Sequence, residues 1–184
     1  MAPPVWYGHT FVLNAYPGTV NVGGGGAFMA YVREIMREFA VEGFRRIVLL
    51  NGHGGNYSPL VLAAEEVAQE FPETEVWLVN WWLDFREDIL SVCSSQGGHA
   101  GEDETSVMLA IRPGLVRMEE ARGGRKRRSK VRVIKRDVGR ELFPDGVNDD
   151  PSGGATAEKG GEAILSVVSE KIARLIAGGE NDGT

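Results

Sequence analysis

The chain has 184 residues, of which 42% are hydrophobic and 25% are charged, and this composition excludes a wholly disordered, collagen-like or coiled-coil protein. The length fits one domain, which we expect over residues 1–178, with a polar tail at 179–184. The net charge of −6 argues against a nucleic-acid-coating protein, the short apolar runs predict no transmembrane segment, and a single cysteine without a secretory leader predicts a cytoplasmic location.

The first predicted elements are a helix and a strand. Two β-prone runs, Val5–Tyr7 and Thr19–Val22, predict strand or loop. Apolar residues at helical spacing predict a helix from Phe28 to Phe39, which Gly43 ends. The branched run Ile47–Leu50 is typical of a strand that is buried on both faces of a parallel sheet.

The alternation of strand and helix then continues. We expect a helix from Pro59 to Phe71, a strand at Val76–Val79, a helix at Glu102–Ile111 and a final amphipathic helix over Ile164–Ile176. This order predicts a three-layer α/β domain, in which the two strands lie side by side. Ligands of such domains bind at the carboxyl ends of the strands.

Two of the three histidines lie in glycine-rich loops that follow these strands. His53 belongs to Asn51–Asn56, directly after the first strand, and His99 lies in Gly97–Gly101. Imidazole binds divalent metals and transfers protons near neutral pH, so we expect His53 and His99 to converge on one site. The alternative is that one histidine hydrogen-bonds a turn and the other caps the next helix.

His9 is a weaker candidate. It lies between Gly8 and Thr10, at a junction where a structural or surface role is the favoured interpretation.

Three consecutive carboxylates, Glu102, Asp103 and Glu104, open the helix that follows His99. The positive end of a helix dipole stabilises such residues without any catalytic role. Neighbours on a helix point in different directions, so at most one or two of these carboxylates can face a metal site.

A basic run reverses the overall charge locally. Nine of the twenty basic residues lie between Arg122 and Arg136. We interpret the run as a solvated loop that leads into an edge strand, and the alternative is contact with nucleic acid or another anionic partner.

Several motifs resemble the creatininase family of metal-dependent amidohydrolases. The resemblance rests mainly on Asn51–Asn56 after a hydrophobic strand and on His99–Ser106. It continues through Tyr16–Thr19, Leu109–Pro113 and Ala155–Gly160, and so spans most of the chain. It implies a three-layer α/β/α creatininase-like fold with a mostly parallel sheet, a homo-oligomer, and hydrolysis of a peptide or non-peptide C–N amide bond in a small-molecule substrate.

The resemblance also implies roles for individual residues. His53 and Glu104 are the expected ligands of a divalent zinc, manganese or iron ion, with Glu102 as the alternative carboxylate ligand. His99 is the expected proton-transfer residue. Creatininase itself has a tyrosine and a glutamate where this chain has Gly54 and Gly55, so specificity for creatinine is not expected. The residues expected to bind substrate are Gly54, Gly55 and Asn56.

Family members carry, before the region that matches Pro3–Tyr7, an amino-terminal strand and a loop with three further metal ligands. The 184-residue sequence has no such segment, so we expect an incomplete metal site and an inactive isolated chain. A noncatalytic homologue that serves assembly or ligand binding is the alternative function, and an anionic-polymer binder using Arg122–Arg136 is a third.

Overall fold

The structure is a computed structural model that describes residues 1–94, 98–121, 131, 133–144, 146–147 and 154–178. The chain divides into two compact units, residues 1–81 and 82–184. The predicted polar tail at 179–184 lies outside the described residues, and the single domain over 1–178 stays a prediction.

The first unit follows the predicted order of elements. An extended segment with one short 3-10 helix leads into two helix–strand pairs, and the β-prone runs in this segment form no strand. Its elements are η1 (Leu13–Ala15), α1 (Gly25–Val41), β1 (Arg46–Asn51), η2 (Gly54–Asn56), α2 (Tyr57–Glu70) and β2 (Glu75–Asn80), and α3 (Trp81–Asp84) follows.

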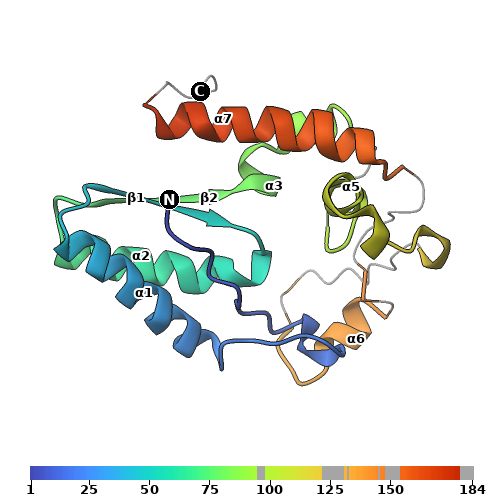
Figure 1. The fold of residues 1–184 in the computed structure, drawn as a ribbon. Coiled ribbons are helices and arrows are strands. Elements are labelled where there is room, and N and C mark those ends of the chain that lie inside the picture. The colour runs from blue at the N-terminus through green and yellow to red at the C-terminus, as the bar shows by residue number, and fades with distance from the viewer. Residues whose placement is uncertain (95–97, 122–130, 132, 145, 148–153, 179–184) are drawn as a thin grey trace. The chain divides into compact units, whose positions relative to one another are not determined.

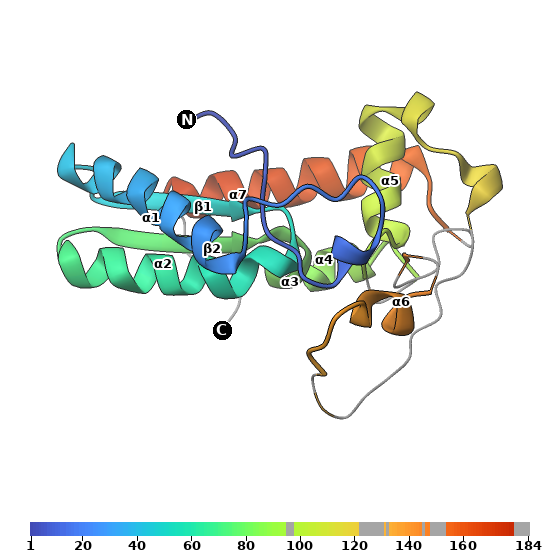
Figure 2. The ribbon, with the colours of Figure 1, turned by 90° about the horizontal axis from the view of Figure 1, so that it is seen from below.

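Strands β1 and β2 pair in parallel along their whole length, from Arg46 opposite Glu75 to Asn51 opposite Asn80. Both strands point the same way in Figure 2. The predicted neighbouring strands are therefore confirmed, and the last residue of each strand lies at the same edge of the sheet.

One face of this sheet packs against both α1 and α2, which lie on the same side of the strands in Figure 1. Helix α1 contributes residues at spacings of four, which places them on one stripe. The core residues are Phe28, Val32, Met36, Ala40, Ile47, Leu60, Ala63 and Val67. Each large apolar side chain buried here contributes about 1.5–3 kcal/mol.

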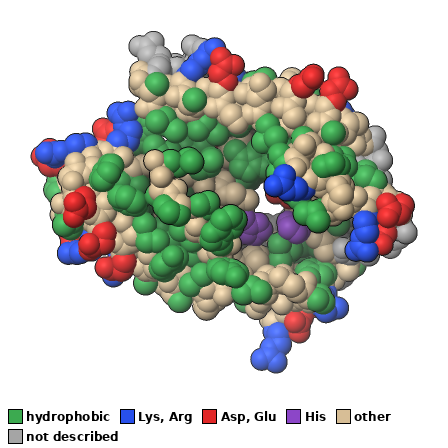
Figure 3. Space-filling view, viewed as in Figure 1, with side chains coloured by type: hydrophobic (Ala, Val, Ile, Leu, Met, Phe, Trp, Pro, Cys, Tyr) green, Lys and Arg blue, Asp and Glu red, His purple; other side chains and the backbone are tan. Residues whose placement is uncertain are grey.

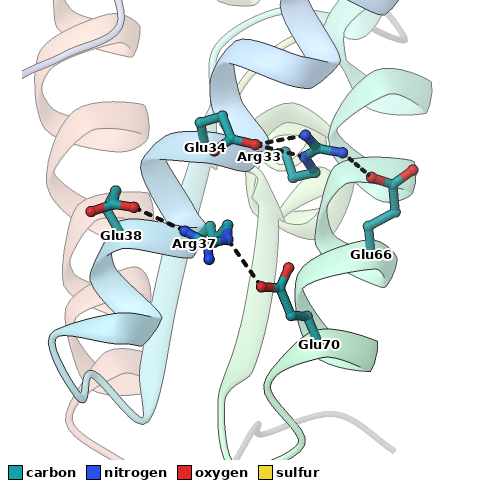
Figure 4. A network of polar contacts seen from close by, with 6 residues as sticks. All are labelled: Arg33, Glu34, Arg37, Glu38, Glu66 and Glu70. Atoms are coloured by element: carbon teal, nitrogen blue, oxygen red, sulfur yellow. Dashed lines mark hydrogen bonds and ion pairs between the residues drawn. The ribbon is translucent and has the colours of Figure 1, made fainter.

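Ion pairs join the outer surfaces of the two helices (Figure 4). Arg33 of α1 contacts Glu66 of α2, and Arg37 contacts Glu70, each at 2.9 Å. Because all four side chains are well exposed, each pair contributes at most about 1 kcal/mol, and the apolar core holds the helices together.

The prediction that the first strand is buried on both faces is wrong at Leu50. This side chain is 61% exposed, although Ile47 in the same strand is buried. Other hydrophobic side chains (green) are also exposed on the face shown in Figure 3.

The second unit is mainly helical over its described residues. Its elements are α4 (Arg86–Leu90), α5 (Glu102–Ile111), η3 (Pro113–Leu115), η4 (Met118–Glu120), α6 (Val138–Leu142), η5 (Lys159–Ser166) and α7 (Val167–Ile176). The predicted helix at Glu102–Ile111 is confirmed. The final predicted helix begins as a π-helix, η5, and continues as the α-helix α7.

Close backbone packing joins α5 to η5. A Cβ atom on Gly160 would lie 1.9 Å from the backbone oxygen of Ser106, so only glycine fits this contact. Ser106 is fully buried, and its Oγ accepts a hydrogen bond from the Thr156 N–H at 3.1 Å.

Most of the basic run at 122–136 lies outside the described residues. The edge strand predicted there is not present at 131 or 133–136, and Lys135 instead pairs with Glu141 at 2.6 Å. Among the helices that the structure describes, none has the length and apolar character needed to cross a membrane.

Candidate functional site

Two buried asparagines mark the carboxyl edge of the sheet. Asn51 ends β1 and Asn80 ends β2, and both are at most 3% exposed. The amide of Asn51 donates a hydrogen bond to Oδ1 of Asn80 at 2.9 Å. This pair ties the two strand ends together beneath the loop that carries His53.

The His53 loop is anchored on the same amide. Oδ1 of Asn51 accepts a hydrogen bond from the His53 backbone N–H at 3.1 Å. Burial lowers the pKa of the His53 imidazole, and the neighbouring His9 lowers it further. This lowered pKa favours the neutral imidazole, which is the form that binds a metal.

The extended amino-terminal segment brings a second histidine to this loop. The His9 backbone N–H donates to Oδ1 of Asn56 at 2.7 Å, which fixes the segment beside the end of β1. A Cβ atom on Gly55 would lie 2.4 Å from the His9 backbone oxygen and 2.9 Å from Nε2 of His53. The backbone of His9 and the imidazole of His53 therefore both border Gly55. Nδ1 of His9 is buried without a hydrogen-bond partner.

The three expected substrate-binding residues form the short helix η2. The side chain of Asn56 holds His9 and donates to Asn51 at 3.3 Å, so this amide serves the scaffold. Gly54 is exposed, whereas the backbone of the amino-terminal segment closes over Gly55. A role of Gly54, Gly55 and Asn56 in substrate binding stays a prediction.

In the second unit, a strained turn links His99 to α5. Ala100 has a φ of +52°, a left-handed conformation that is uncommon for a residue with a side chain. Its N–H donates to Oε2 of Glu104 at 2.7 Å. Gly101, and not His99, is the N-cap residue of α5.

The side chains of Glu104 and His99 lie close together in this turn. Oε2 of Glu104 lies 3.9 Å from Nδ1 of His99, and both side chains are about one-third exposed. Burial raises the pKa of Glu104 to about 7, with the Ala100 N–H opposing this shift and Asp103 adding to it. Carboxylates with such shifts cluster at functional sites.

The carboxylate of Glu102 is engaged elsewhere. It is 1% exposed, and its Oε1 accepts a hydrogen bond from Nζ of Lys159 at 2.5 Å. Its Oε2 accepts hydrogen bonds from both the N–H and the Oγ of Ser94 at 2.8 Å. Glu102 thus joins three segments of the second unit, which favours Glu104 over Glu102 as a metal ligand.

The expected site residues thus lie in two groups, His53 in the first unit and His99 with Glu104 in the second. Their convergence stays a prediction. Within the described part of the chain, no three histidine, cysteine or acidic side chains gather into a metal-binding cluster. The sequence patterns did not predict the roles of Asn80 and Lys159, although an asparagine after each apolar strand was a visible signal for Asn80.

Comparisons with known proteins add to this geometry. The profile of the creatininase family, described as creatinine amidohydrolase, matches residues 1–176. The mycofactocin precursor peptide peptidase of Mycobacterium ulcerans (strain Agy99) is 30% identical over 179 residues, covering 95% of this chain. This chain spans 65% of the length of that relative.

Solved structures agree with the profile. A mutant creatininase of the Zn-Zn type and a manganese creatininase each superpose with a TM-score of 0.76 at 28% identity. Each match covers 90% of this chain, and 67% and 68% of the two structures, respectively. The α/β fold is therefore the creatininase fold. By its profile match, its motifs and its structure, the chain belongs to the creatininase family.

Proposed function

We propose that this chain carries catalytic residues of a metal-dependent amidohydrolase, which cleaves a C–N amide bond of the peptide or non-peptide kind. In this proposal His53 and Glu104 hold a divalent ion and His99 transfers a proton. Its relatives named above are hydrolases, and the names peptidase and creatinine amidohydrolase both denote cleavage of an amide bond.

The residues present fit a divalent ion. His53 favours its neutral form, and Glu104 is a largely buried carboxylate whose pKa is raised chiefly by desolvation, which a positive ion beside it would offset. Zinc, manganese and iron all accept imidazole and carboxylate ligands. When bound, such an ion polarises the amide carbonyl and lowers the pKa of water.

In this proposal, His99 transfers the proton and Glu104 positions His99. His99 would accept a proton from the attacking water as the water oxygen bonds to the carbonyl carbon. It would then donate this proton to the amide nitrogen as the C–N bond breaks, so that the nitrogen leaves as a neutral amine. Oε2 of Glu104 lies 3.9 Å from Nδ1 of His99, so this carboxylate is placed to orient the ring. The backbone of Ala100 keeps the carboxylate in place beside it.

The single observation that carries the proposal is this arrangement of Glu104. A carboxylate with a pKa of about 7 is fixed by a strained backbone turn next to an imidazole, in a chain of a hydrolase family. A carboxylate that only stabilises the start of a helix does so in its charged form. Burial disfavours this charged form, so the burial of Glu104 does not serve a capping role.

The test uses the 184-residue chain and a chimera that adds, before Pro3, the family-type amino-terminal segment that the resemblance implies. Both are loaded with zinc or manganese and assayed against a panel of peptide and small-molecule amides. We expect hydrolysis by the chimera and a loss of about 10²- to 10⁴-fold in kcat in its His99→Ala variant, as is typical for a general acid. His53→Ala should abolish both metal retention and activity.

A chimera that binds metal and hydrolyses none of the amides would favour the alternative function, a noncatalytic homologue in assembly or ligand binding. We also propose that the protein is a homo-oligomer and lies in the cytoplasm. In the same preparation, product analysis identifies the amide that is cleaved, elemental analysis identifies the bound metal, and light scattering measures the oligomeric state.

A further inference from the structure

We propose that His9 is a second histidine ligand of the ion held by His53, and that it binds through Nδ1. This inference rests on the proposed metal site at His53, and it adds a ligand for which the sequence had favoured a structural or surface role.

The first observation is the state of the His9 ring. Nδ1 is buried and has no hydrogen-bond partner, and it is the one such side-chain atom among the described residues. Leaving a buried polar atom unpaired costs about 1–3 kcal/mol, so such atoms are rare in native structures, and a bound ion is one of the features that account for them. Nε2 is the ring atom nearest to Gly25, and it would lie 3.3 Å from a Cβ atom there. The Nε2 side of the ring thus faces Gly25, and Nδ1 lies on the side of the ring that faces away from it.

The second observation is the contact with His53. The His9 backbone oxygen and Nε2 of His53 both lie within 3 Å of one point, the position of a Cβ atom on Gly55. Any side chain at position 55 would enter this space. The glycine therefore permits the backbone of His9 to lie close to the imidazole of His53.

The third observation is how firmly the segment around His9 is held. Its N–H is bound by Asn56, and the Thr10 N–H donates to Oδ1 of Asn21 at 3.0 Å. The carbonyl of Gly8 accepts a hydrogen bond from the Val22 N–H at 3.0 Å. Three consecutive residues are thus fixed to neighbouring segments, and a preorganised ligand loses little entropy on binding a metal.

The chemistry selects the class of ion. Two imidazole ligands suit zinc and the neighbouring transition metals, and they suit magnesium or calcium poorly, because those ions prefer oxygen ligands. The ion expected at this site is therefore zinc or a similar divalent transition metal.

The experiment titrates the metal-free 184-residue protein with Zn²⁺ and follows the imidazole ¹⁵N resonances by NMR, with assignments from the variants. Zinc affinity is measured in parallel by competition with a chromogenic chelator. His9→Phe keeps an aromatic ring of similar size and removes both nitrogens, and Tyr7→Phe, at an exposed position two residues before His9, is the control. Thermal melts verify that each variant is folded.

We expect zinc to shift Nδ1 of His9 together with a nitrogen of His53. His9→Phe should weaken zinc binding by at least about 10-fold. Mutating a residue that only hydrogen-bonds to a metal ligand already lowers metal affinity by about this factor. If zinc shifts His53 alone and His9→Phe binds zinc as the wild type does, the inference is overturned while the metal site at His53 stands. If His53→Ala also leaves zinc affinity unchanged, both the inference and the proposed site fail. Should His9→Phe not fold, the wild-type Nδ1 shift alone decides between these results.

Discussion

Lys159 and Glu102 form an ion pair in which the carboxylate is 1% exposed and the lysine is partly exposed, with Nζ of Lys159 2.5 Å from Oε1 of Glu102. The lysine also donates to the carbonyl of Gly154 at 2.8 Å, so it connects the residues before η5 to the first turn of α5. Through this turn the pair supports Glu104 and His99.

Removal of the lysine should therefore be costly. Lys159→Met leaves the Glu102 charge buried, and the loss of one partner of a buried pair destabilises by about 3–5 kcal/mol. The exposed pair of Lys171 and Asp88, at 2.8 Å, is the control, and Lys171→Met should cost no more than about 1 kcal/mol. Urea denaturation measures both. Equal losses in the two variants would contradict a special role for Lys159.

The contact at Gly160 gives a second prediction. Gly160→Ala forces a methyl group into the backbone of Ser106, and we expect a loss of at least about 2 kcal/mol, in the range of overpacked cores. The adjacent Gly161 is the matched control, because a Cβ atom there meets Ala110 at an ordinary 3.6 Å. Gly161→Ala should be neutral or slightly stabilising, since alanine is favoured over glycine in helices. The thermal midpoints of the two variants would be indistinguishable if this packing were loose.

Gly55 and Gly52 form a similar pair in the His53 loop. A Cβ atom on Gly52 has no neighbour within 4 Å, whereas one on Gly55 would clash with His9. Gly55→Ala should displace the amino-terminal segment and destabilise the first unit by about 1–3 kcal/mol, and Gly52→Ala should change its stability by less than about 1 kcal/mol. Amide hydrogen exchange at His9 reports the displacement directly. Unchanged protection of this amide in Gly55→Ala would refute the close contact.

The raised pKa of Glu104 predicts how stability depends on pH in the metal-free protein. The folded state binds the proton with a pKa of about 7, against 4.5 for an unperturbed glutamate. Stability due to this group is thus fully present below pH 4.5 and decreases as pH rises to 7. The total change is about 1–3 kcal/mol, since nearly one-third of the side chain stays solvated.

Glu104→Gln should remove this dependence, so that the variant is more stable than the wild type at about pH 8 and similar at about pH 4. Urea denaturation across this range, with chelator present, tests the prediction. Parallel stability curves for the two proteins would show that Glu104 does not titrate in this window.

The sequence predicted the regular elements well, because their signals are local. The stripe of Phe28, Val32 and Met36 defines α1, and the apolar run before Asn51 defines β1. It also singled out His53 and His99, because glycines around a histidine after a strand are unusual.

The remaining features depend on contacts between distant residues. Lys159 and Glu102 are 57 positions apart, and Asn56 and His9 are 47 apart. Periodicity carries no information about such pairs. The same reason explains why the sequence left Glu102 and Glu104 as alternative ligands, since only the contact with Lys159 separates their roles.

The proposed function requires a metal ion, held through His53 and Glu104, for hydrolysis of the amide. The most direct measurement is the rate of amide hydrolysis by the metal-loaded chimera, before chelation, after removal of the metal, and after one equivalent of zinc or manganese is returned. We predict that chelation abolishes hydrolysis, that the returned ion restores it, and that His53→Ala cannot be restored. Hydrolysis that persists at the same rate after complete removal of the metal would contradict the proposal.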